Sequence, residues 1–325
     1  MKVTITDYTF PDLEIEERIL KTAGCEVVAR NCKTEDELIA LVADADAVIT
    51  QFARINAAVI GAMTRARAIV RYGIGVDNVD LDAARARGIA VSNIPDYCID
   101  EVADHTLAYI LGLTRQVVAH TADLRAGNWR LAVPVPEMKA LRDQTVGVIG
   151  FGRIGREVVS RLLPFKCRVF VHDPVVSAAD ITAAGAAAAT LDEIFSTADI
   201  ITLHCPSTPA TRRIIGPASL GKMKPGALLI NVARGDLVDT AALVAALQSK
   251  RVAAAALDVF DPEPLPADHA LRTLPNVIIA PHIASVSVVA VKKLCEGAAT
   301  RAATAARGEL PPNVVNGITS PRQMP

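Results

Sequence analysis

Three side chains in the second half of the chain could together hold a carboxylate and move a proton. Arg234, in the run NVARGD, carries a permanent charge on a planar group that can bind a carboxylate through two hydrogen bonds. His282, in PHIA, is of the residue type that gains or loses a proton near neutral pH. Glu263, in DPEP, can fix the orientation of an imidazole and favour its protonated form. We therefore predict Arg234, Glu263 and His282 as catalytic residues.

Each of these residues alone has a simpler explanation. A single arginine usually lies on the surface, a single glutamate is usually solvated, and a single histidine is more often a hydrogen-bonded structural residue. The catalytic interpretation is favoured because all three follow strands of one predicted sheet, and parallel strands place their carboxyl ends at one edge.

Residues 145–173 have the pattern of a unit that binds a dinucleotide. An apolar run ends at Gly150, the sequence GFGRIG opens an amphipathic segment, and a second apolar run ends at Asp173. Gly150 would permit a tight turn, Gly152 a close approach of the backbone to a pyrophosphate, and Gly155 close packing of helix on strand. Asp173 lies 18 residues after the last glycine, where a carboxylate can accept the hydroxyl groups of a ribose.

Glycines also mark ordinary turns, so this motif alone is weak evidence. Here the preceding strand, the following helix and the acidic residue agree, which favours cofactor binding over a structural turn. Asp173 is followed by Pro174 and two valines, with no Arg or Lys to meet a 2′-phosphate. We therefore predict NAD(H) rather than NADP(H) as the cofactor.

The chain after residue 173 predicts the rest of a parallel sheet. Strand-like runs at residues 199–203, 227–232, 253–257 and 277–280 join the two above to give about six strands, after a helical alanine-rich piece. These runs and the one before Asp173 stop beside residues able to do chemistry, namely Asp173, His204, residues 233–235, Asp258 and residues 281–282. Open α/β sheets bind their ligands at this carboxyl edge.

Residues 1–100 predict a separate, smaller α/β domain. Strand-like runs at residues 3–6, 25–29, 47–50, 68–72 and 89–92 alternate with helical patterns. Thr34 and Glu37 have capping-box spacing at the start of one of these helices. The alternation predicts a second parallel sheet with covering helices.

The sequence RYGIGVDNVD follows the fourth of these strands. Gly73 and Gly75 free the backbone at the carboxyl end of that strand, where N–H groups can face an anion such as a carboxylate. In the alternative, the glycines form a turn and Asp80 caps the next helix. One loop can do both, so the two interpretations are compatible.

From Asp100 the pattern is helical and apolar on nearly every side. Such a helix is usually buried, so we expect it between domains or subunits, as the connection between the two domains. The segment 129–141, which contains the single tryptophan, has no clear period and is expected to be a loop or an arm packed on a partner.

Composition excludes several classes of protein. At 325 residues the chain is too long for one ordinary core, so two domains are expected. No apolar run reaches the roughly 18 residues of a membrane span, and acidic residues near the N-terminus disfavour a signal peptide, so a cytoplasmic location is expected. With 34 basic and 35 acidic residues, no nucleic-acid partner is expected, and the six scattered cysteines predict no metal site.

These motifs, taken in order, resemble those of the D-isomer-specific 2-hydroxyacid dehydrogenases. The resemblance runs from about residue 46 to residue 317 and rests on RYGIGVDNVD, GFGRIG with Asp173, NVARGDLVD, ALDVFDPEP, PHIA and PPNVVNG. It implies an α/β protein with two doubly wound parallel sheets. A Rossmann NAD-binding domain would span residues 101–289, and a flavodoxin-like substrate domain residues 1–100, completed by residues 290–325. It also implies a homodimer formed through the cofactor domains.

The resemblance further implies a role for each matching residue. Arg234 would hold the substrate, Glu263 and His282 would form the acid/base pair, and Asp258 would bind the nicotinamide amide. The predicted cofactor contacts are Thr106, Gly150, Gly152, Arg153, Ile154, Gly155, Asp173, His204, Cys205, Pro206, Thr211, Val232, Ala233, Arg234, Asp258 and His282. The predicted substrate contacts are Arg71, Tyr72, Gly73, Ile74, Gly75, Arg234, His282 and Ser285, with the N–H groups of residues 74 and 75 on the carboxylate.

Within the family, the chain is most similar to the branch that includes the C-terminal binding protein corepressors. Those proteins have a tryptophan after the histidine motif, where this chain has Ser285, so corepressor-like substrate selection is not expected. The predicted activity is reversible transfer of hydride between NADH and the C2 carbonyl of a small 2-oxo acid. An NAD-sensing binding protein of the corepressor type is the alternative, and formate dehydrogenase is disfavoured because those relatives lack a carboxylate like Glu263. The sequence names neither the substrate nor the physiological direction.

Overall fold

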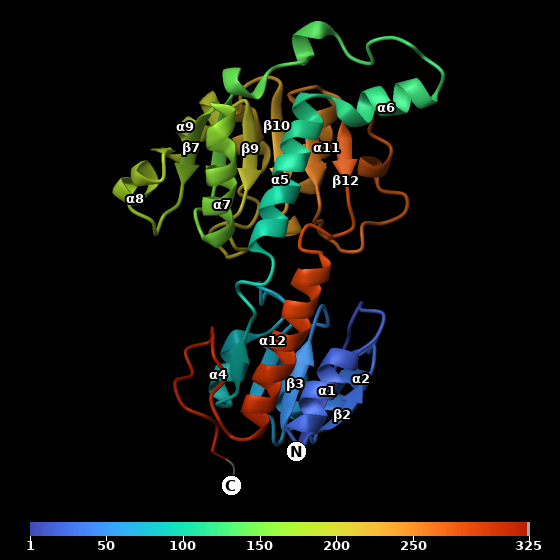
Figure 1. Ribbon diagram of the computed structural model, residues 1–325, viewed down its shortest axis with the longest axis vertical. Helices are drawn as coiled ribbons and strands as arrows, with labels where there is room; N and C mark the ends of the chain where they lie inside the picture. Colours follow the sequence, from blue (N-terminus) through green and yellow to red (C-terminus); the bar gives the residue numbers. More distant parts are fainter. Residues whose placement is uncertain (324–325) are drawn as a thin grey trace. The chain divides into compact units, whose positions relative to one another are not determined.

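The computed structural model describes residues 1–323, which form two compact units (Figure 1). Unit 1 contains Met1–Tyr97 and the segment from Ser287 onward, and unit 2 contains Cys98–Val286. Each unit has its own parallel β-sheet covered by helices on both faces, which confirms the predicted α/β class.

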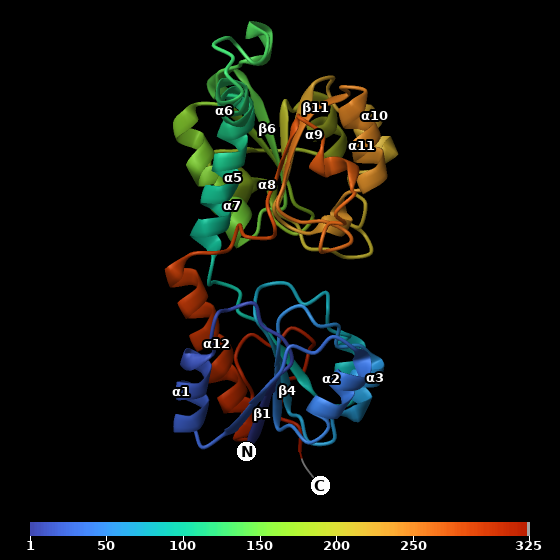
Figure 2. The ribbon, with the colours of Figure 1, turned by 90° about the vertical axis from the view of Figure 1, so that its right-hand side faces the viewer.

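Unit 1 has a five-stranded sheet in the order β2-β1-β3-β4-β5. This is the flavodoxin-like order of a doubly wound sheet. Figure 2 shows α1 and α12 on one face and α2 and α3 on the other. Its elements are β1 (Lys2–Ile5), α1 (Glu14–Thr22), β2 (Glu26–Ala29), α2 (Glu35–Val42), β3 (Ala47–Thr50), α3 (Ala57–Ala62), β4 (Ala68–Arg71), α4 (Leu81–Ala86), β5 (Ala90–Ser92) and α12 (Val288–Ala306).

Local sequence explains where the helices of unit 1 begin. Thr34 and Glu37 make the predicted capping box at α2, and the Asp80 side chain accepts the N–H of Ala83 at the start of α4. Asn56 caps α3 in the same way. These side chains satisfy N–H groups that the first turn of a helix leaves without a partner.

Unit 2 has a seven-stranded sheet in the order β12-β11-β10-β9-β6-β7-β8. Counted from β6, its first six strands have the Rossmann arrangement, in which the order reverses between β6 and β9. Its regular elements are α5 (Ile99–Thr114), α6 (Val117–Arg125), β6 (Thr145–Ile149), α7 (Arg153–Leu162), β7 (Arg168–His172), α8 (Ala178–Ala183), β8 (Ala187–Ala188), α9 (Leu191–Thr197), β9 (Ile200–Leu203), α10 (Pro217–Lys222), β10 (Ala227–Asn231), α11 (Thr240–Gln248), β11 (Val252–Leu257) and β12 (Val277–Ile279). Short 3-10 turns occur at Val135–Glu137, Leu141–Asp143, Leu163–Phe165, Gly235–Leu237 and Ala270–Arg272.

The alanine-rich piece after Asp173 differs from its prediction as a helix. It contains two helices, α8 and α9, separated by the strand β8, which pairs in parallel with Phe170 and Val171 of β7. The described sheet therefore has seven strands rather than about six. A two-residue edge strand of exposed alanines has neither the length nor the alternating pattern that reveals a strand in sequence.

The long helix predicted from Asp100 is two helices. The chain breaks at Gln116, whose φ of +55° is left-handed and cannot continue an α-helix. α5 is buried on much of its surface and packs on α7, β10 and β11, so it belongs to unit 2 rather than connecting the units. α6 has no buried residue within this chain, so its expected burial against a second subunit stays a prediction.

Candidate active site

The predicted site residues of unit 2 follow successive parallel strands at one edge of the sheet. Gly150 follows β6, Asp173 follows β7, and His204 follows β9. Arg234, Asp258 and His282 follow β10, β11 and β12. Because all these strands run parallel, these residues all lie at one edge of one sheet.

The glycine-rich turn after β6 requires two of its three glycines for steric reasons. Gly150 has a φ of +101°, and a Cβ there would lie 2.5 Å from the backbone N of Cys205. A Cβ on Gly155 would lie 2.1 Å from the carbonyl O of Gly150. A larger residue at position 150 would therefore collide with the segment after β9, and one at position 155 would push α7 away from the end of β6.

Gly152 is different, because a Cβ there would meet no atom within 4 Å. The residue is the N-cap of α7, and no side chain caps this helix. The first turn of α7, which contains Arg153 and Ile154, therefore directs its N–H groups and the positive end of its dipole toward open space. These features fit the pyrophosphate of a dinucleotide, which needs an anion site free of side chains.

Asp173 connects the end of β7 to this turn. Its carboxylate accepts the N–H of Phe151 at 2.7 Å, and the N–H groups of Val175 and Val176 at 2.9 and 3.1 Å. Burial disfavours the charge, but these three hydrogen bonds outweigh it, so the pKa of Asp173 is lowered. Asp173 is thus held rigid and ionised, as an acceptor for ribose hydroxyl groups must be.

The segment after β9 presents neutral groups to the glycine-rich turn. The ring Nε2 of His204 lies 2.9 Å from Thr202 Oγ1, and burial lowers the pKa of His204 to about 3. Burial raises the pKa of the Cys205 thiol to about 11. Thr211 donates to the carbonyl O of Pro206 at 2.6 Å and so closes the turn that follows. Neither ring nor thiol therefore places a charge beside the turn at neutral pH.

Arg234 is positioned by its neighbours in the loop after β10. The buried Asn231 donates from Nδ2 to the carbonyl O of Arg234 at 2.7 Å and accepts the N–H of Ala233 at 3.0 Å. The next residue, Gly235, packs so closely that a Cβ would lie 1.9 Å from the carbonyl of Phe260. This contact places the Arg234 loop directly against the loop that contains Glu263.

Glu263 and His282 form the predicted pair. The Nδ1 of His282 lies 2.9 Å from Oε2 of Glu263, while Oε1 of Glu263 accepts the N–H of Phe260 at 2.8 Å. Burial disfavours the charge of Glu263, but the hydrogen bond with His282 and the charges of His282 and Arg234 outweigh it and lower the pKa of Glu263. The three residues predicted to be catalytic therefore lie close enough to influence one another.

Asp258 is fully buried and holds the loop that contains His282. Its two carboxylate oxygens accept the N–H groups of Ile283 and Ala284, both at 2.8 Å, and its carbonyl O accepts the N–H of His282 at 2.8 Å. Burial raises the pKa of Asp258, although these hydrogen bonds and the charges of two histidines act in the opposite direction. His282 has a left-handed φ of +57°, which this set of bonds maintains. The predicted contact of Asp258 with a nicotinamide amide would add to this positioning role.

In unit 1, the backbone of residues 73–75 is anchored by its carbonyl groups. The carbonyl O of Gly73 accepts the N–H of Ile94 at 3.0 Å, and that of Ile74 accepts Nδ2 of Asn93 at 2.6 Å. In a trans peptide the N–H points away from the C=O. The N–H groups of Ile74 and Gly75 therefore each point away from the anchor of their own peptide group.

Two residues predicted to bind substrate are buried at the end of β4. The side chain of Tyr72 is 1% exposed and donates to Glu16 at 2.8 Å, so only its backbone could meet a ligand. Arg71 is 9% exposed, with its guanidinium over the ring of Phe52, and its Nη1 takes the space that a Cβ on Gly73 would need. Gly73 has a φ of +143°, which residues with a Cβ rarely adopt, and this backbone conformation explains the glycine.

The remaining predicted contacts have ordinary surroundings. Thr106 is fully buried in α5 and donates to the carbonyl O of Val102 at 2.7 Å. Val232 is buried and Ser285 is partly exposed. Their roles in binding stay predictions.

Sequence reasoning missed the asparagines that shape these loops. Asn231 is the last residue of β10, and Asn93 directly follows β5. Each donates a hydrogen bond to a backbone carbonyl of a loop predicted to bind ligand. The available signal was their place at strand ends, where short amides are often used to fix turns.

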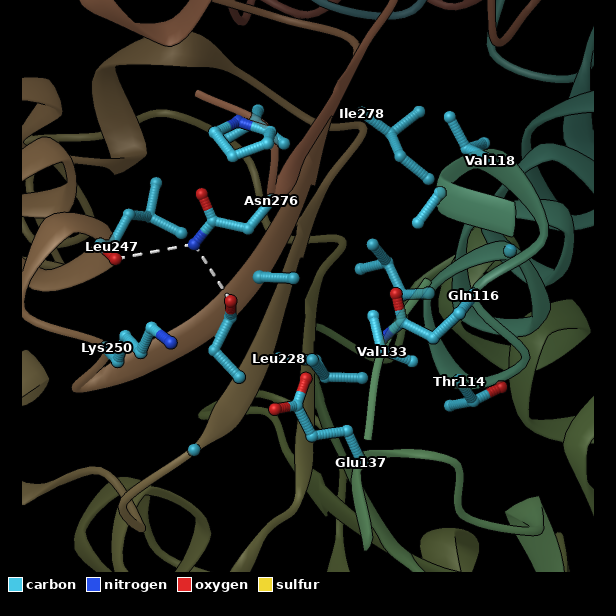
Figure 3. Close-up of a pocket in the computed structure, with 18 of the residues that line it drawn as sticks. Thr114, Gln116, Val118, Val133, Glu137, Leu228, Leu247, Lys250, Asn276 and Ile278 are labelled. Carbon is cyan, nitrogen blue, oxygen red and sulfur yellow. Dashed lines mark hydrogen bonds between the residues drawn. The ribbon is translucent and has the colours of Figure 1, made fainter. Parts of the chain in front are cut away.

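A pocket of about 800 Å³ lies at the opposite edge of the unit 2 sheet (Figure 3). Its lining residues include Asp199, Leu228 and Val277, at the starts of the strands. Figure 3 shows Gln116 and Val133 on one side and Leu247 and Asn276 on the other. It is therefore separate from the residues predicted to be catalytic.

Residues 1–323 offer neither a metal site nor a membrane span. No group of three or more His, Cys, Asp or Glu side chains among them could hold a metal ion, and their six cysteines form no disulfide. None of the helices formed by these residues is long and apolar enough to cross a membrane. The cytoplasmic location and the absence of a nucleic-acid partner stay predictions.

Comparison with known proteins places this geometry in a family. Residues 107–284 match the model of the D-isomer specific 2-hydroxyacid dehydrogenase NAD binding domain. The chain is 39% identical over 283 residues to D-3-phosphoglycerate dehydrogenase of Mycobacterium tuberculosis. The matching region covers 86% of this chain but only 53% of that protein. It thus spans about half the length of that relative.

Two further relatives are similar over most of their length. The chain is 36% identical to glyoxylate reductase of Thermofilum pendens, with 90% of this chain and 88% of that protein covered. The structure of D-lactate dehydrogenase from Aquifex aeolicus, complexed with NAD and lactic acid, matches with a TM-score of 0.84 at 29% identity, covering 94% and 96% of the two chains. These relatives give no support to the corepressor alternative. The chain therefore belongs to the D-isomer specific 2-hydroxyacid dehydrogenase family and has that family's NAD-binding domain.

Proposed function

We propose that the chain is an NAD-dependent oxidoreductase that reversibly reduces a small 2-oxo acid to a D-2-hydroxy acid. The observation that carries the proposal is the Glu263–His282 pair, whose Nδ1 and Oε2 atoms lie 2.9 Å apart beside Arg234. These residues share the carboxyl edge of one sheet with an anion site suited to a dinucleotide. An acid/base pair and a cofactor site at one sheet edge are what the reaction needs.

In this proposal Arg234 binds the substrate carboxylate and polarises the C2 carbonyl group. Bound NAD(H) supplies or accepts the hydride. Protonated His282 gives its proton to the carbonyl oxygen during reduction, and neutral His282 removes it during oxidation. Because Nδ1 of His282 faces Glu263, the exchange takes place at Nε2. Glu263 stabilises the protonated ring and keeps its orientation fixed.

Unit 1 itself offers backbone donors that could bind a carboxylate. We propose the N–H groups of Ile74 and Gly75 as donors, because their peptide planes are anchored by Ile94 and Asn93 on the other side. Ser285 would contribute a small polar wall beside His282.

Steady-state oxidation of NADH tests the proposal. The panel would contain glyoxylate, hydroxypyruvate, pyruvate and bulkier 2-oxo acids, with D-lactate and 3-phosphoglycerate in the oxidative direction. We expect turnover of at least one short 2-oxo acid, loss of that turnover in Arg234→Ala, and its retention in Arg212→Ala, which removes an exposed arginine of the same unit. NADH binding without turnover of any acid would contradict the proposed function.

We also propose that the chain forms a homodimer through unit 2. Large apolar side chains on α6 and in the segment that follows are exposed: Val117, Val118, Leu124, Trp129, Leu131 and Val135. Trp129 is 91% exposed, which is unusual for the largest apolar side chain. A second copy covering this surface would account for it.

Light scattering after size-exclusion chromatography measures the mass of the assembly. We expect twice the chain mass for the wild type and dissociation in Trp129→Asp. Val175→Asp is the matched control, since Val175 is 90% exposed on the same unit but outside this surface. A monomeric wild type would contradict the dimer.

A further inference from the structure

The order of the unit 1 sheet reverses between β1 and β3, and ligands of doubly wound sheets bind at such a switch point. In unit 1 the residues at this place are Asp7, shortly after β1, and residues 51–53, directly after β3. The loop 51–53 offers three consecutive backbone N–H groups, an arrangement that binds anions.

The anion in this place is the protein's own carboxylate. Asp7 accepts the N–H groups of Gln51 at 3.0 Å, of Phe52 at 2.5 Å and of Ala53 at 3.0 Å. Its Oδ1 also accepts the hydroxyl groups of Thr6 at 2.8 Å and Thr50 at 3.2 Å. One carboxylate thus takes five hydrogen bonds, three of which come from residues 44 to 46 positions away. Charge-assisted bonds of this kind are stronger than those between neutral groups.

The carbonyl groups of the same loop connect it to the loop after β4. Asn78 donates from Nδ2 to the carbonyl O of Ala53 at 2.9 Å and more weakly to that of Gln51 at 3.4 Å. Asn78 lies three residues after Gly75. The backbone of Ile55 also pairs with that of Asn78 and Asp80. The position of residues 51–53 therefore fixes one end of residues 73–78.

A side-chain contact makes a second connection. The guanidinium of Arg71 lies 5.8 Å from the centre of the Phe52 ring, and its Nη1 packs against Gly73. Phe52 is the central residue of the segment bound to Asp7. A shift of this segment would therefore reach Gly73 through Arg71 as well as through Asn78.

We propose that Asp7 is a positioning residue for substrate binding, because its carboxylate fills the anion site at the switch point of unit 1 and thereby fixes residues 51–53 and 73–78. The inference rests on the proposed function only in taking Ile74 and Gly75 as donors to the substrate carboxylate. Asp7 itself touches neither substrate nor cofactor.

Asp7→Ala tests this role in the full chain. We expect KM for the best 2-oxo acid to rise about 10-fold, with kcat and the Kd of NADH within about threefold of wild type, because ground-state binding alone is weakened. Formate should partly restore the low KM in Asp7→Ala, since it can occupy the emptied anion site, and should not improve the wild type. An unchanged KM, or an equal loss in kcat and NADH binding, would overturn the proposal.

Asp46→Asn is the matched control. Asp46 is a buried aspartate of the same sheet, and its carboxylate accepts the N–H of Lys2 at 2.7 Å and binds Arg65 at 2.9 Å. It directly precedes β3, whereas the loop bound to Asp7 directly follows it. We expect Asp46→Asn to lower the thermal stability while KM stays at the wild-type value. A rise in KM as large as that of Asp7→Ala would mean that any weakening of unit 1 has the same effect, and would overturn the proposal.

Hydrogen exchange followed by mass spectrometry gives a readout that needs no activity. We expect faster exchange in peptides covering residues 51–53 and 73–78 in Asp7→Ala but not in Asp46→Asn, and unchanged exchange there would overturn the proposal. If Asp7→Ala does not fold, Thr50→Val is the second variant, because it removes one hydroxyl bond to Asp7. The same peptides should still exchange faster in Thr50→Val. Exchange as slow as in the wild type would overturn the proposal. A wild type that reduces no 2-oxo acid would contradict the proposed function, and hydrogen exchange would then still test the role of Asp7.

Discussion

The two sheets reverse their strand order in the same way, but only one of them has a side chain in the anion site at the switch point. In unit 2 the switch point lies between β6 and β9, where α7 begins without a side-chain cap and a Cβ on Gly152 would meet no atom within 4 Å. In unit 1 the switch point lies between β1 and β3, and the carboxylate of Asp7 fills it. One anion site is left for a ligand, and the other is closed by the protein itself.

A switch point therefore does not by itself indicate a ligand. What distinguishes the two is whether a side chain already satisfies the N–H groups at the strand ends. Asp173 and Asp7 show the contrast, since each follows the end of a strand and accepts several backbone N–H groups. Asp173 lies beside the turn of the open site, where it is predicted to accept a ribose, whereas Asp7 occupies its site.

The largest expected effect concerns the charged side chain at the edge of unit 2. Arg234→Lys keeps the charge but loses the planar pair of donors, so kcat/KM for the 2-oxo acid should fall roughly 100-fold or more. Binding of NADH, measured by fluorescence titration, should change little. If kcat/KM of this variant stays within about threefold of wild type, Arg234 does not belong to the site, and the contrast between the units is weaker.

A smaller effect is expected at the open switch point. Asp173→Ala removes the ribose acceptor and the like-charge repulsion of a 2′-phosphate, so the preference for NADH over NADPH should fall by roughly 30-fold. The ratio of kcat/KM for the two cofactors measures it. Equal use of both cofactors by the wild type would contradict the predicted selectivity.

The pH dependence tests the acid/base pair. The attraction that lowers the pKa of Glu263 equally stabilises protonated His282. Glu263→Gln removes this attraction, so the alkaline limb of kcat/KM for reduction should move to lower pH, as should the acidic limb for oxidation. Limbs that stay in place, or move to higher pH, would mean that Glu263 does not tune His282.

The smallest effect is expected at the amino edge of the unit 2 sheet. Asp199 accepts the N–H of Thr145 at 2.9 Å and binds Lys224 at 2.7 Å. Burial opposes its charge, but these bonds outweigh it, so its pKa is lowered in the folded protein. Asp199→Asn should lower the free energy of unfolding by about 1 kcal/mol at pH 7, with kcat/KM unchanged.

The sign of the pH effect at Asp199 follows from the lowered pKa. Its stabilisation is present above the unfolded pKa of about 4 and is lost as the pH falls through the lower folded value. Urea unfolding of wild type and Asp199→Asn should therefore converge in acid. If the difference in the free energy of unfolding between the two proteins is the same at pH 3 as at pH 7, the effect of the substitution comes from side-chain shape rather than from charge.

Much of the fold could be predicted because its signals are local. The alternation of apolar runs, the capping box at Thr34 and Glu37 and the glycine pattern from Gly150 to Gly155 each lie within one short stretch. The strand β8 and the break at Gln116 could not, since two exposed alanines and one left-handed residue leave no periodic pattern.

Which residue types follow each strand could be read from the amino-acid order, and parallel strands then required Asp173, Arg234 and His282 to share one edge. The pairing of Glu263 with His282 was predicted from the sequence, whereas the hold of Asp258 on the His282 loop and the closure of the unit 1 switch point by Asp7 are visible only in the folded chain. The physical reason is that these bonds join atoms far apart in the chain, up to 46 residues for Asp7. Their partners are mostly backbone N–H groups, which nearly every residue has and which no sequence pattern distinguishes.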